Sequence, residues 1–241
     1  MLWDVRTEKA FKILPAHSDP VTSVDFQAKG VSNPLLATGG FDGLIRLWDQ
    51  RIWRCHLTIA GADNPPVGNV QFSPNGKYLL SSTLANKLQL YALNDEFRSV
   101  RARAEVGATL KRRREESNGP LKQEGGVAHS VPTATYRGVL CSKLITVPSM
   151  KTLERKDPET GRFLEHQNVL SCGSEDGSIL FWRMETTDAL PFECIPRGGE
   201  EHKDGHTDAV MAVHLLGDWV ASCSKDGTAK IWTKENTRKV A

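Results

Sequence analysis

Two histidines of this chain are each followed, further along, by an aspartate that precedes a glycine. His17 is followed in this way by Asp42, and His206 by Asp226. A histidine held by a carboxylate can act as a general base, so each pair has the residue types that acid–base catalysis uses. Inside a β-sheet the same residues could instead satisfy one another, because an unpaired buried polar group costs about 1–3 kcal/mol. We favour the structural interpretation for both pairs.

No other motif of the sequence indicates an enzyme, a metal or a cofactor. We find no nucleophile elbow, P-loop, zinc-protease HExxH or strand-following GxGxxG pattern. The diglycine Gly198–Gly199 is flanked by Pro196, Arg197 and Glu200, and is interpreted as a loop. The five cysteines are odd in number and form no CxxC pair, which predicts free thiols. We therefore expect no catalytic residue, no metal site and no cofactor.

The segments that carry the candidate residues form an internal repeat. Three copies contain an apolar run, a small-residue step, an Asp-Gly turn and a strand that ends in tryptophan; they lie at Leu35–Asp49, Val169–Trp182 and Val220–Trp232. A weaker copy at Val67–Tyr91 ends in tyrosine, and a fragment opens the chain at Leu2–Val5. The period is roughly 45 residues, with one longer step that indicates an insertion.

This repeat predicts β-structure throughout. Asp-Gly between two alternating apolar runs is a hairpin signal, and in a type I′ turn both central residues adopt positive φ. Four short strands per repeat are typical of a propeller blade. The predicted fold class is therefore all-β, a β-propeller with four recognisable blades plus a partial one.

The repeat resembles the WD-repeat family over residues 1–97 and 138–233. The resemblance implies that each complete blade is locked by a hydrogen-bonded tetrad of histidine, hydroxyl residue, aspartate and tryptophan. The tetrads fall on His17, Thr38, Asp42 and Trp48, and on His206, Ser222, Asp226 and Trp232. The third blade retains only Asp176 and Trp182, and the tyrosine blade has neither the histidine nor the aspartate. Those two blades must depend more on packing.

Four segments, at 14–21, 63–67, 72–78 and 173–176, resemble the propeller subunits of COMPASS-type histone methyltransferase complexes. The resemblance implies a non-catalytic, nuclear scaffold that binds protein subunits and peptides, including a SET-domain methyltransferase and a histone tail. The alternative is a propeller adaptor of another complex, such as a ubiquitin-ligase substrate receptor or an RNA-processing factor. Neither interpretation implies specific nucleic-acid binding or a membrane partner.

The related propellers have seven blades, so we expect this chain to be a fragment of such a ring rather than a closed four-bladed one. Its strand at 10–14 belongs by spacing to the partial blade and is not free to close the last blade, which includes Trp219–Trp232. We expect the chain to form an open arc, or to be marginally stable and to self-associate, because unpaired sheets are prone to association.

The resemblance implies two binding sites. One is an arginine pocket at the rim of the central channel, which would involve Thr22, Phe41, Gly68 and Ser142. Ser142 stands near the place of an aromatic ring and Lys143 adds a like charge, which disfavours arginine there. The other is a side cleft for a hydrophobic, acidic segment, which would involve Asn75, Tyr78, Leu90, Val147 and Glu185. Ordinary blade packing is an equal alternative for Tyr78 and Leu90, and Glu185 would repel an acidic ligand.

The charge of the chain is concentrated in one polar insertion. The net charge is only +2, but seven basic residues and one acidic residue lie between Arg98 and Arg114. We predict three regions: a partial blade and two blades over 1–97, a disordered basic insertion over 98–135, and two further blades over 136–241. Within the insertion, Lys111, Arg112, Arg113 and Arg114 are a candidate nuclear import signal, and a solvated loop is the alternative. A second polar stretch, at 151–166, is predicted to form a surface hairpin.

No signal peptide or membrane span is indicated, and we expect a soluble intracellular protein.

Overall fold

The computed structural model describes residues 1–27, 34–61, 63–93, 127–128, 132–156, 163–184, 189–200, 202–233 and 238–239. These residues form strands and connecting loops, and the structure has no helix among them. None of them therefore forms a helix able to cross a membrane. The predicted all-β class is confirmed.

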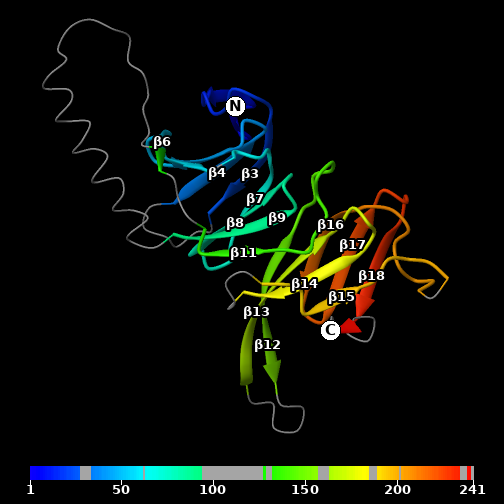
Figure 1. Ribbon diagram of the computed structural model, residues 1–241. Coiled ribbons are helices and arrows are strands. Elements are labelled where there is room, and N and C mark those ends of the chain that lie inside the picture. Colours follow the sequence, from blue (N-terminus) through cyan, green and yellow to red (C-terminus); the bar gives the residue numbers. More distant parts are fainter. Residues whose placement is uncertain are drawn as a thin grey trace, which may run out of the picture.

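Four antiparallel sheets follow one another along the chain, as a propeller requires. Figure 1 shows the first of them on the left, the last on the right and the two middle sheets between them. We number them blades 1 to 4. Each is built by hairpins, so its strands follow the chain from one edge of the sheet towards the other.

The strands of blades 1 and 2 are as follows. Blade 1 comprises β3 (Val21–Phe26), β4 (Leu35–Gly40), β5 (Leu44–Asp49) and β6 (Arg54–Ala60), and β10 (Val127–Ala128) is added parallel to β6. Blade 2 comprises β7 (Val67–Phe72), β8 (Tyr78–Thr83), β9 (Lys87–Ala92) and β11 (Ala134–Tyr136). A separate hairpin of β1 (Leu2–Asp4) and β2 (Lys9–Lys12) precedes blade 1.

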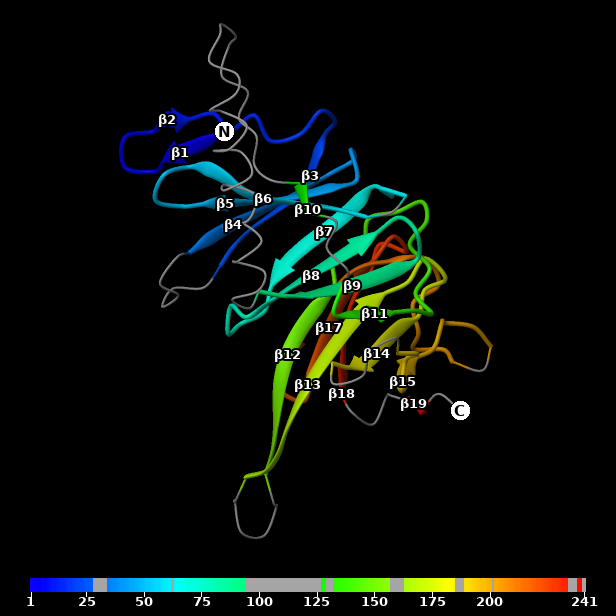
Figure 2. The ribbon, with the colours of Figure 1, turned by 60° about the vertical axis from the view of Figure 1, so that its left-hand side comes forward.

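Blades 3 and 4 complete the described fold. Blade 3 comprises β12 (Ser149–Lys156), β13 (Phe163–Gly173), β14 (Ile179–Arg183), β15 (Glu193–Ile195) and β19 (Arg238–Lys239). Blade 4 comprises β16 (Val210–Leu216), β17 (Trp219–Ser224) and β18 (Ala229–Thr233). Strands β12 and β13 are paired over their length and project from the body of the molecule (Figure 2), which confirms the predicted hairpin.

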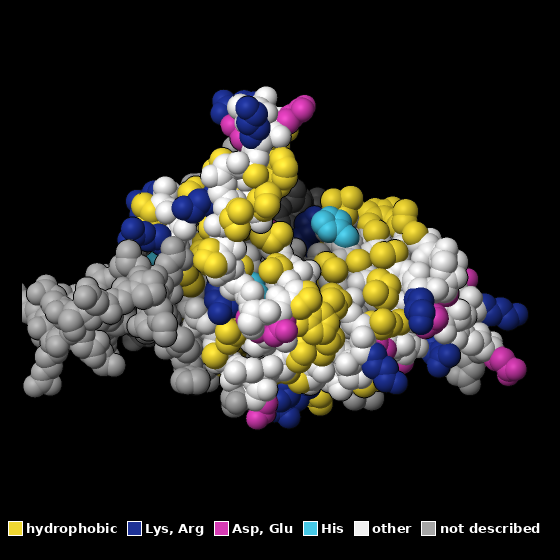
Figure 3. Space-filling view, turned by 90° about the horizontal axis from the view of Figure 1, so that it is seen from above, with side chains coloured by type: hydrophobic (Ala, Val, Ile, Leu, Met, Phe, Trp, Pro, Cys, Tyr) yellow, Lys and Arg dark blue, Asp and Glu magenta, His cyan; other side chains and the backbone are white. Residues whose placement is uncertain are grey.

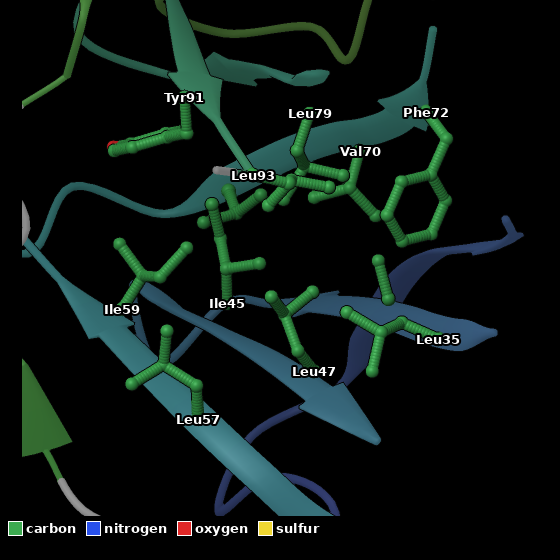
Figure 4. Packing of buried hydrophobic residues seen from close by; sticks show 12 residues of the cluster. Leu35, Ile45, Leu47, Leu57, Ile59, Val70, Phe72, Leu79, Tyr91 and Leu93 are labelled. Atoms are coloured by element: carbon green, nitrogen blue, oxygen red, sulfur yellow. The ribbon is translucent and has the colours of Figure 1, made fainter. Parts of the chain in front are cut away.

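The core lies between the blades rather than within any one of them. Figure 4 shows Leu47 and Ile45 of blade 1 facing Val70 and Leu79 of blade 2, and the cluster that they form is fully buried. Similar clusters join blade 2 to blade 3 and blade 3 to blade 4. Each blade thus buries one apolar face against the next, which is the main stabilising contribution of a propeller.

Two sequence predictions about local structure need correction. The Asp-Gly turns are not type I′, because only the glycines Gly43, Gly177 and Gly227 have positive φ and the aspartates do not. In blade 1 a three-residue loop joins β4 to β5, and the left-handed glycine closes it. At Gly43 the close approach of the Asn64 carbonyl also leaves no room for a side chain.

The predicted insertion also ends too late. Strands β10 and β11 lie partly or wholly inside 98–135, because Ala134 to Tyr136 complete blade 2 by pairing with β9. Strands this short have no strong local signal in the sequence. The rest of the predicted insertion, including Lys111, Arg112, Arg113 and Arg114, lies outside the described residues.

Candidate functional site

The structure brings together the tetrad residues of blade 1. In its loop before β3, His17 is held through Nδ1 by Asp42 at 2.8 Å and through Nε2 by the Thr38 hydroxyl at 2.9 Å. The indole of Trp48 donates to the same hydroxyl at 3.0 Å. Arg46 adds an ion pair of 3.1 Å to the second oxygen of Asp42. The histidine side chain is fully buried, so no substrate reaches it and the group is a structural lock.

Blade 4 repeats this arrangement with serine in place of threonine. His206 contacts Asp226 at 2.9 Å and the Ser222 hydroxyl at 2.8 Å, and Trp232 donates to that hydroxyl at 2.7 Å. The hydroxyl of Thr228 holds the pKa of Asp226 well below its usual range, against the effect of burial, and His206 contributes further. Burial alone would raise the pKa of Asp42, but its hydrogen bonds lower it overall.

Blade 3 replaces the tetrad by a different arrangement. Cys172 occupies the position that Thr38 and Ser222 hold in the other blades, four residues before the aspartate of the turn. Its thiol is fully buried, which raises its pKa to about 12. The indole of Trp182 instead donates to the Arg137 carbonyl at 3.0 Å. The sequence showed that the histidine was missing but did not reveal this second partner.

The candidate rim residues lie along the inner side of the first three blades. Thr22 and Gly68 are on the neighbouring first strands β3 and β7, where the Thr22 hydroxyl donates to the Val67 carbonyl at 2.7 Å. This bond ties blade 1 to blade 2. Phe41 is exposed on the loop that follows β4. Ser142 is exposed and contacts Glu175 at 3.4 Å, so its hydroxyl faces a carboxylate rather than an aromatic ring. An arginine sandwich involving Ser142 stays a prediction without structural support.

Three of the candidate side-cleft residues meet in one cleft between blades 2 and 3. Asn75, Tyr78 and Leu90 line a cavity of about 290 Å³. Blade 2 supplies its floor and blade 3 the opposite wall. The other lining residues are Ser73, Pro74, Thr133, Ala134, Met150, Lys151, Thr152, Asn168 and Met184. Clefts of this size with mixed apolar and polar walls are typical ligand sites.

The structure does not bring the remaining two residues to this cleft. Val147 forms a parallel bridge with Ala212 of β16, and its backbone N–H donates to the Met211 carbonyl at 2.8 Å. It therefore joins blade 3 to blade 4, because the segment before β12 runs along the inner edge of the sheets. Val147 therefore does not line this cleft, and its partner-binding role stays a prediction. Glu185 lies outside the described residues.

Sequence reasoning missed the groups that give the cleft its chemistry. Lys151 is its one charged lining residue among those described, but it pairs with Val169 on the side of β12 that faces blade 4, where its ammonium donates to the Leu215 carbonyl at 3.5 Å. Met150 and Met184 supply flexible apolar wall, which adapts to irregular side chains. Lys151 was visible in the sequence only as part of a polar stretch, since its position depends on how β12 packs beside blade 2.

The amide oxygen of Asn75 is engaged within the protein. It accepts hydrogen bonds from the Ser73 hydroxyl at 2.7 Å and from the Lys77 N–H at 3.0 Å, which fixes the turn between β7 and β8. Among the described residues, the amide nitrogen has no partner and remains able to donate. On the opposite wall, Thr152 donates to Asn168 at 2.7 Å. Polar groups at both ends of an apolar cleft suit an extended peptide.

No cluster of three or more metal-ligating side chains occurs in the part of the chain that the structure describes. The cysteines found there are free, and two of the five, Cys141 and Cys172, are buried. Their burial raises the pKa of both thiols.

Comparisons with known proteins agree with the blade architecture. The WD40 family, described as WD domain, G-beta repeat, matches residues 8–49, 53–91 and 200–233. These three segments cover blades 1, 2 and 4, the last of which carries the second tetrad. These segments of the chain are therefore WD40 repeats, and they fold as blades of a β-propeller.

Among individual proteins, the chain is similar to COMPASS component SWD3 of Saccharomyces cerevisiae, with 24% identity over 96% of this chain. The chain spans 61% of the length of that relative. Pre-mRNA-processing factor 19 of Oryza sativa subsp. japonica is 37% identical over 32% of this chain and 14% of its own length. Periodic tryptophan protein 2 homolog of Caenorhabditis elegans is 22% identical over 97% of this chain and 19% of its own length.

A solved structure supports the fold independently of function. The computationally designed Ika4 protein superposes with a TM-score of 0.53 at 17% identity, covering 92% of this chain and 95% of its own. At this identity the likeness concerns the fold alone.

Proposed function

We propose that the chain is a non-catalytic scaffold that binds a segment of a partner protein in the cleft between blades 2 and 3. The observation that carries the proposal is the convergence of Asn75, Tyr78, Leu90 and Met184 on that cleft. The partly buried side chains of Tyr78 and Met184 offer apolar contact above the buried Leu90, and the amide nitrogen of Asn75 offers a hydrogen-bond donor. The preferred ligand is an extended segment with hydrophobic residues and an acidic group.

The similarity to SWD3 supports a place in a COMPASS-like histone methyltransferase complex. In this role the chain holds subunits together, with a SET-domain methyltransferase and a histone tail among the partners, and acts in the nucleus. The basic run at Lys111, Arg112, Arg113 and Arg114 supports nuclear import from the sequence alone. Substitution of all four by alanine in a fluorescent fusion tests this point, and undiminished nuclear signal would refute it.

A second candidate is an adaptor of another assembly. The similarity to pre-mRNA-processing factor 19 favours an RNA-processing factor over a ubiquitin-ligase substrate receptor as the specific alternative. Both candidates use the same cleft for a protein segment, and they differ in the complex that supplies it.

Affinity purification from the source cell distinguishes the candidates. The wild-type chain is expected to recover a SET-domain subunit, and the variant Tyr78→Ala/Thr152→Glu is expected to lose it. Lys225→Glu is the matched control, because it introduces the same acidic side chain at an exposed turn of blade 4, away from the cleft. Recovery of RNA-processing subunits with loss in the cleft variant would support the second candidate. Equal recovery by wild type and cleft variant would refute the cleft as the binding site.

A further inference from the structure

The first and last blades each expose an apolar surface that the middle blades bury. On blade 1 the first strand exposes Val21, Val24 and Phe26, the last two by 59% and 53%. On blade 4 the surface turned away from blade 3 exposes Trp219 and Ile231, the latter by 71%. Because both surfaces are exposed in the same molecule, they do not cover each other. Exposed apolar surface of this kind marks an interaction site.

The exposed strand of blade 1 is the counterpart of a buried strand of blade 2. Strand β3 reads Val-Thr-Ser-Val-Asp-Phe and β7 reads Val-Gly-Asn-Val-Gln-Phe, with a bulge between the first and third residues of each. Val21, Val24 and Phe26 thus correspond to Val67, Val70 and Phe72. In blade 2, Val67, Val70 and Phe72 are at most 6% exposed. They are covered by Leu35, Ala37, Ile45 and Leu47 of blade 1. Figure 4 shows that contact.

The exposed surface of blade 4 is the counterpart of the surface that covers β7. In blade 1, Ala37 pairs with Leu47 across β4 and β5. In blade 4, Ala221 pairs with Ile231 at the equivalent place, across β17 and β18. Trp219 corresponds to Leu35. Blade 4 therefore presents the same apolar pattern that blade 1 lays on its neighbour. We call its exposed residues Leu216, Trp219, Ala221, Cys223, Ala229 and Ile231 the blade 4 end face.

A hydrogen bond between blades 1 and 2 also has a possible counterpart between the blade 4 end face and β3. The Asp25 carboxylate on β3 accepts a hydrogen bond from the Phe72 N–H at 2.7 Å. The same position on β16 is His214, which is exposed beside the blade 4 end face. A neutral imidazole can accept a hydrogen bond from a backbone N–H, as this carboxylate does. The Phe26 N–H is the equivalent group on β3; it donates to the Asp25 carboxylate of its own strand at 2.9 Å and exchanges that partner for His214 on docking.

We infer that the blade 4 end face of one copy docks on strand β3 of a second copy of this chain. The two surfaces are the halves of the interface that already joins blades 1 and 2, so each copy carries the complement of the other. Such a contact is head to tail, not symmetric, and it leads to a closed ring or an open chain of copies according to the rotation at each step. Figure 3 shows that hydrophobic side chains also gather on the face seen from above, where they stand among charged ones. Only the two end surfaces repeat an interface found within the chain.

Sedimentation velocity of the 241-residue chain over a concentration series tests the inference. The wild type is expected to sediment with a mass above the 26.6 kDa of one copy, increasing with concentration. Phe26→Glu spoils the β3 surface and Ile231→Glu spoils the blade 4 end face, so each variant alone is expected to be a monomer. Both side chains are largely exposed, and the near-UV circular dichroism of each variant is expected to match the wild type.

Sedimentation of a mixture of the two variants tests the head-to-tail contact most directly. Phe26→Glu keeps an intact blade 4 end face and Ile231→Glu keeps an intact β3 surface, so the mixture regains one good interface and forms a dimer of one copy of each. Leu190→Glu is the matched control, because Leu190 is 73% exposed outside both surfaces, and it is expected to associate as the wild type does. A wild type that stays monomeric at all concentrations, or a mixture that stays monomeric, would overturn the inference.

Discussion

Blades 1 and 4 hold their strands together by a buried polar network, whereas blades 2 and 3 achieve the same sheet by other means. In blade 4 the imidazole of His206 links a carboxylate to a hydroxyl, and every member has a partner. In blade 3 the hydroxyl is replaced by Cys172, and Trp182 turns to a backbone carbonyl. In blade 2, Tyr91 is buried and its hydroxyl donates to Gln89.

The comparison teaches that the tetrad specifies a blade but is not required to form one. A fully satisfied buried network is stabilising, and it is damaging once one member is removed, because the others remain buried without partners. A blade held by apolar packing lacks that vulnerability. The four predictions below follow from this difference, beginning with the largest effect.

Removing a tetrad histidine is expected to have the largest effect. His206→Ala leaves Asp226 and Ser222 without their shared partner and opens a cavity, so the free energy of unfolding is expected to fall by about 3 kcal/mol. Urea denaturation followed by tryptophan fluorescence measures it. Lys225→Ala, at an exposed turn of the same blade, is the control and is expected to change the value by less than about 0.5 kcal/mol. Similar losses for both variants would show that the network of blade 4 is not stabilising.

Giving blade 3 the hydroxyl residue of the tetrad blades is expected to lower the free energy of unfolding, although matching the other blades would by itself suggest stabilisation. Cys172→Ser gives blade 3 the hydroxyl of the tetrad blades, but no histidine is present to bond it and Trp182 already has a partner. The free energy of unfolding is therefore expected to fall by about 1 kcal/mol, because a more polar group is buried. Thr38→Cys in blade 1 is the reciprocal variant and is expected to cost about 2 kcal/mol, since both His17 and Trp48 lose a strong partner. Stabilisation by Cys172→Ser would contradict this account.

Acid is expected to weaken the tetrad blades first. The folded-state pKa values of Asp42 and Asp226 lie below the ordinary value, so their ionised forms stabilise the fold above about pH 4. That contribution is lost as the pH falls through the lowered values. The urea midpoint of the wild type is expected to drop between about pH 4 and pH 2 and to drop less steeply in Asp42→Asn and Asp226→Asn. Parallel curves for wild type and both variants would contradict it.

Shortening the insertion is expected to have the smallest effect, provided that β10 and β11 are kept. Replacing residues 98–126 by a Gly/Ser linker of about ten residues changes the loop-closure entropy by only about 1 kcal/mol. The thermal midpoint is expected to shift by less than about 8 °C. Extending the deletion to residue 135 removes most of β11, which contains the buried Ala134, and is expected to destabilise blade 2 far more. Equal effects of the two deletions would show that β11 adds nothing to that blade.

The sequence was sufficient to predict the blades, because Asp-Gly turns and strand-ending tryptophans recur with a constant spacing. It was also sufficient to predict that Asn75, Tyr78 and Leu90 share a cleft, since the resemblance fixes their places on β7 to β9. It failed where packing between distant segments decides the outcome. Val147 pairs with blade 4, Met150 and Thr152 line the cleft from β12, and β11 follows the insertion. Short strands and side-chain partners of this kind have no local signal in the chain.

Binding of a synthetic peptide tests the central claim most directly, that the cleft between blades 2 and 3 receives a hydrophobic, acidic segment. A labelled peptide that carries two aliphatic residues next to an acidic one is titrated with the wild-type chain, and fluorescence anisotropy is measured at low salt. Saturable binding is expected, with at least a tenfold loss in Thr152→Glu, which places an acidic group on the cleft wall, and in Tyr78→Ala, and no loss in Lys225→Glu. No binding to the wild type, or equal binding to all four proteins, would contradict the account.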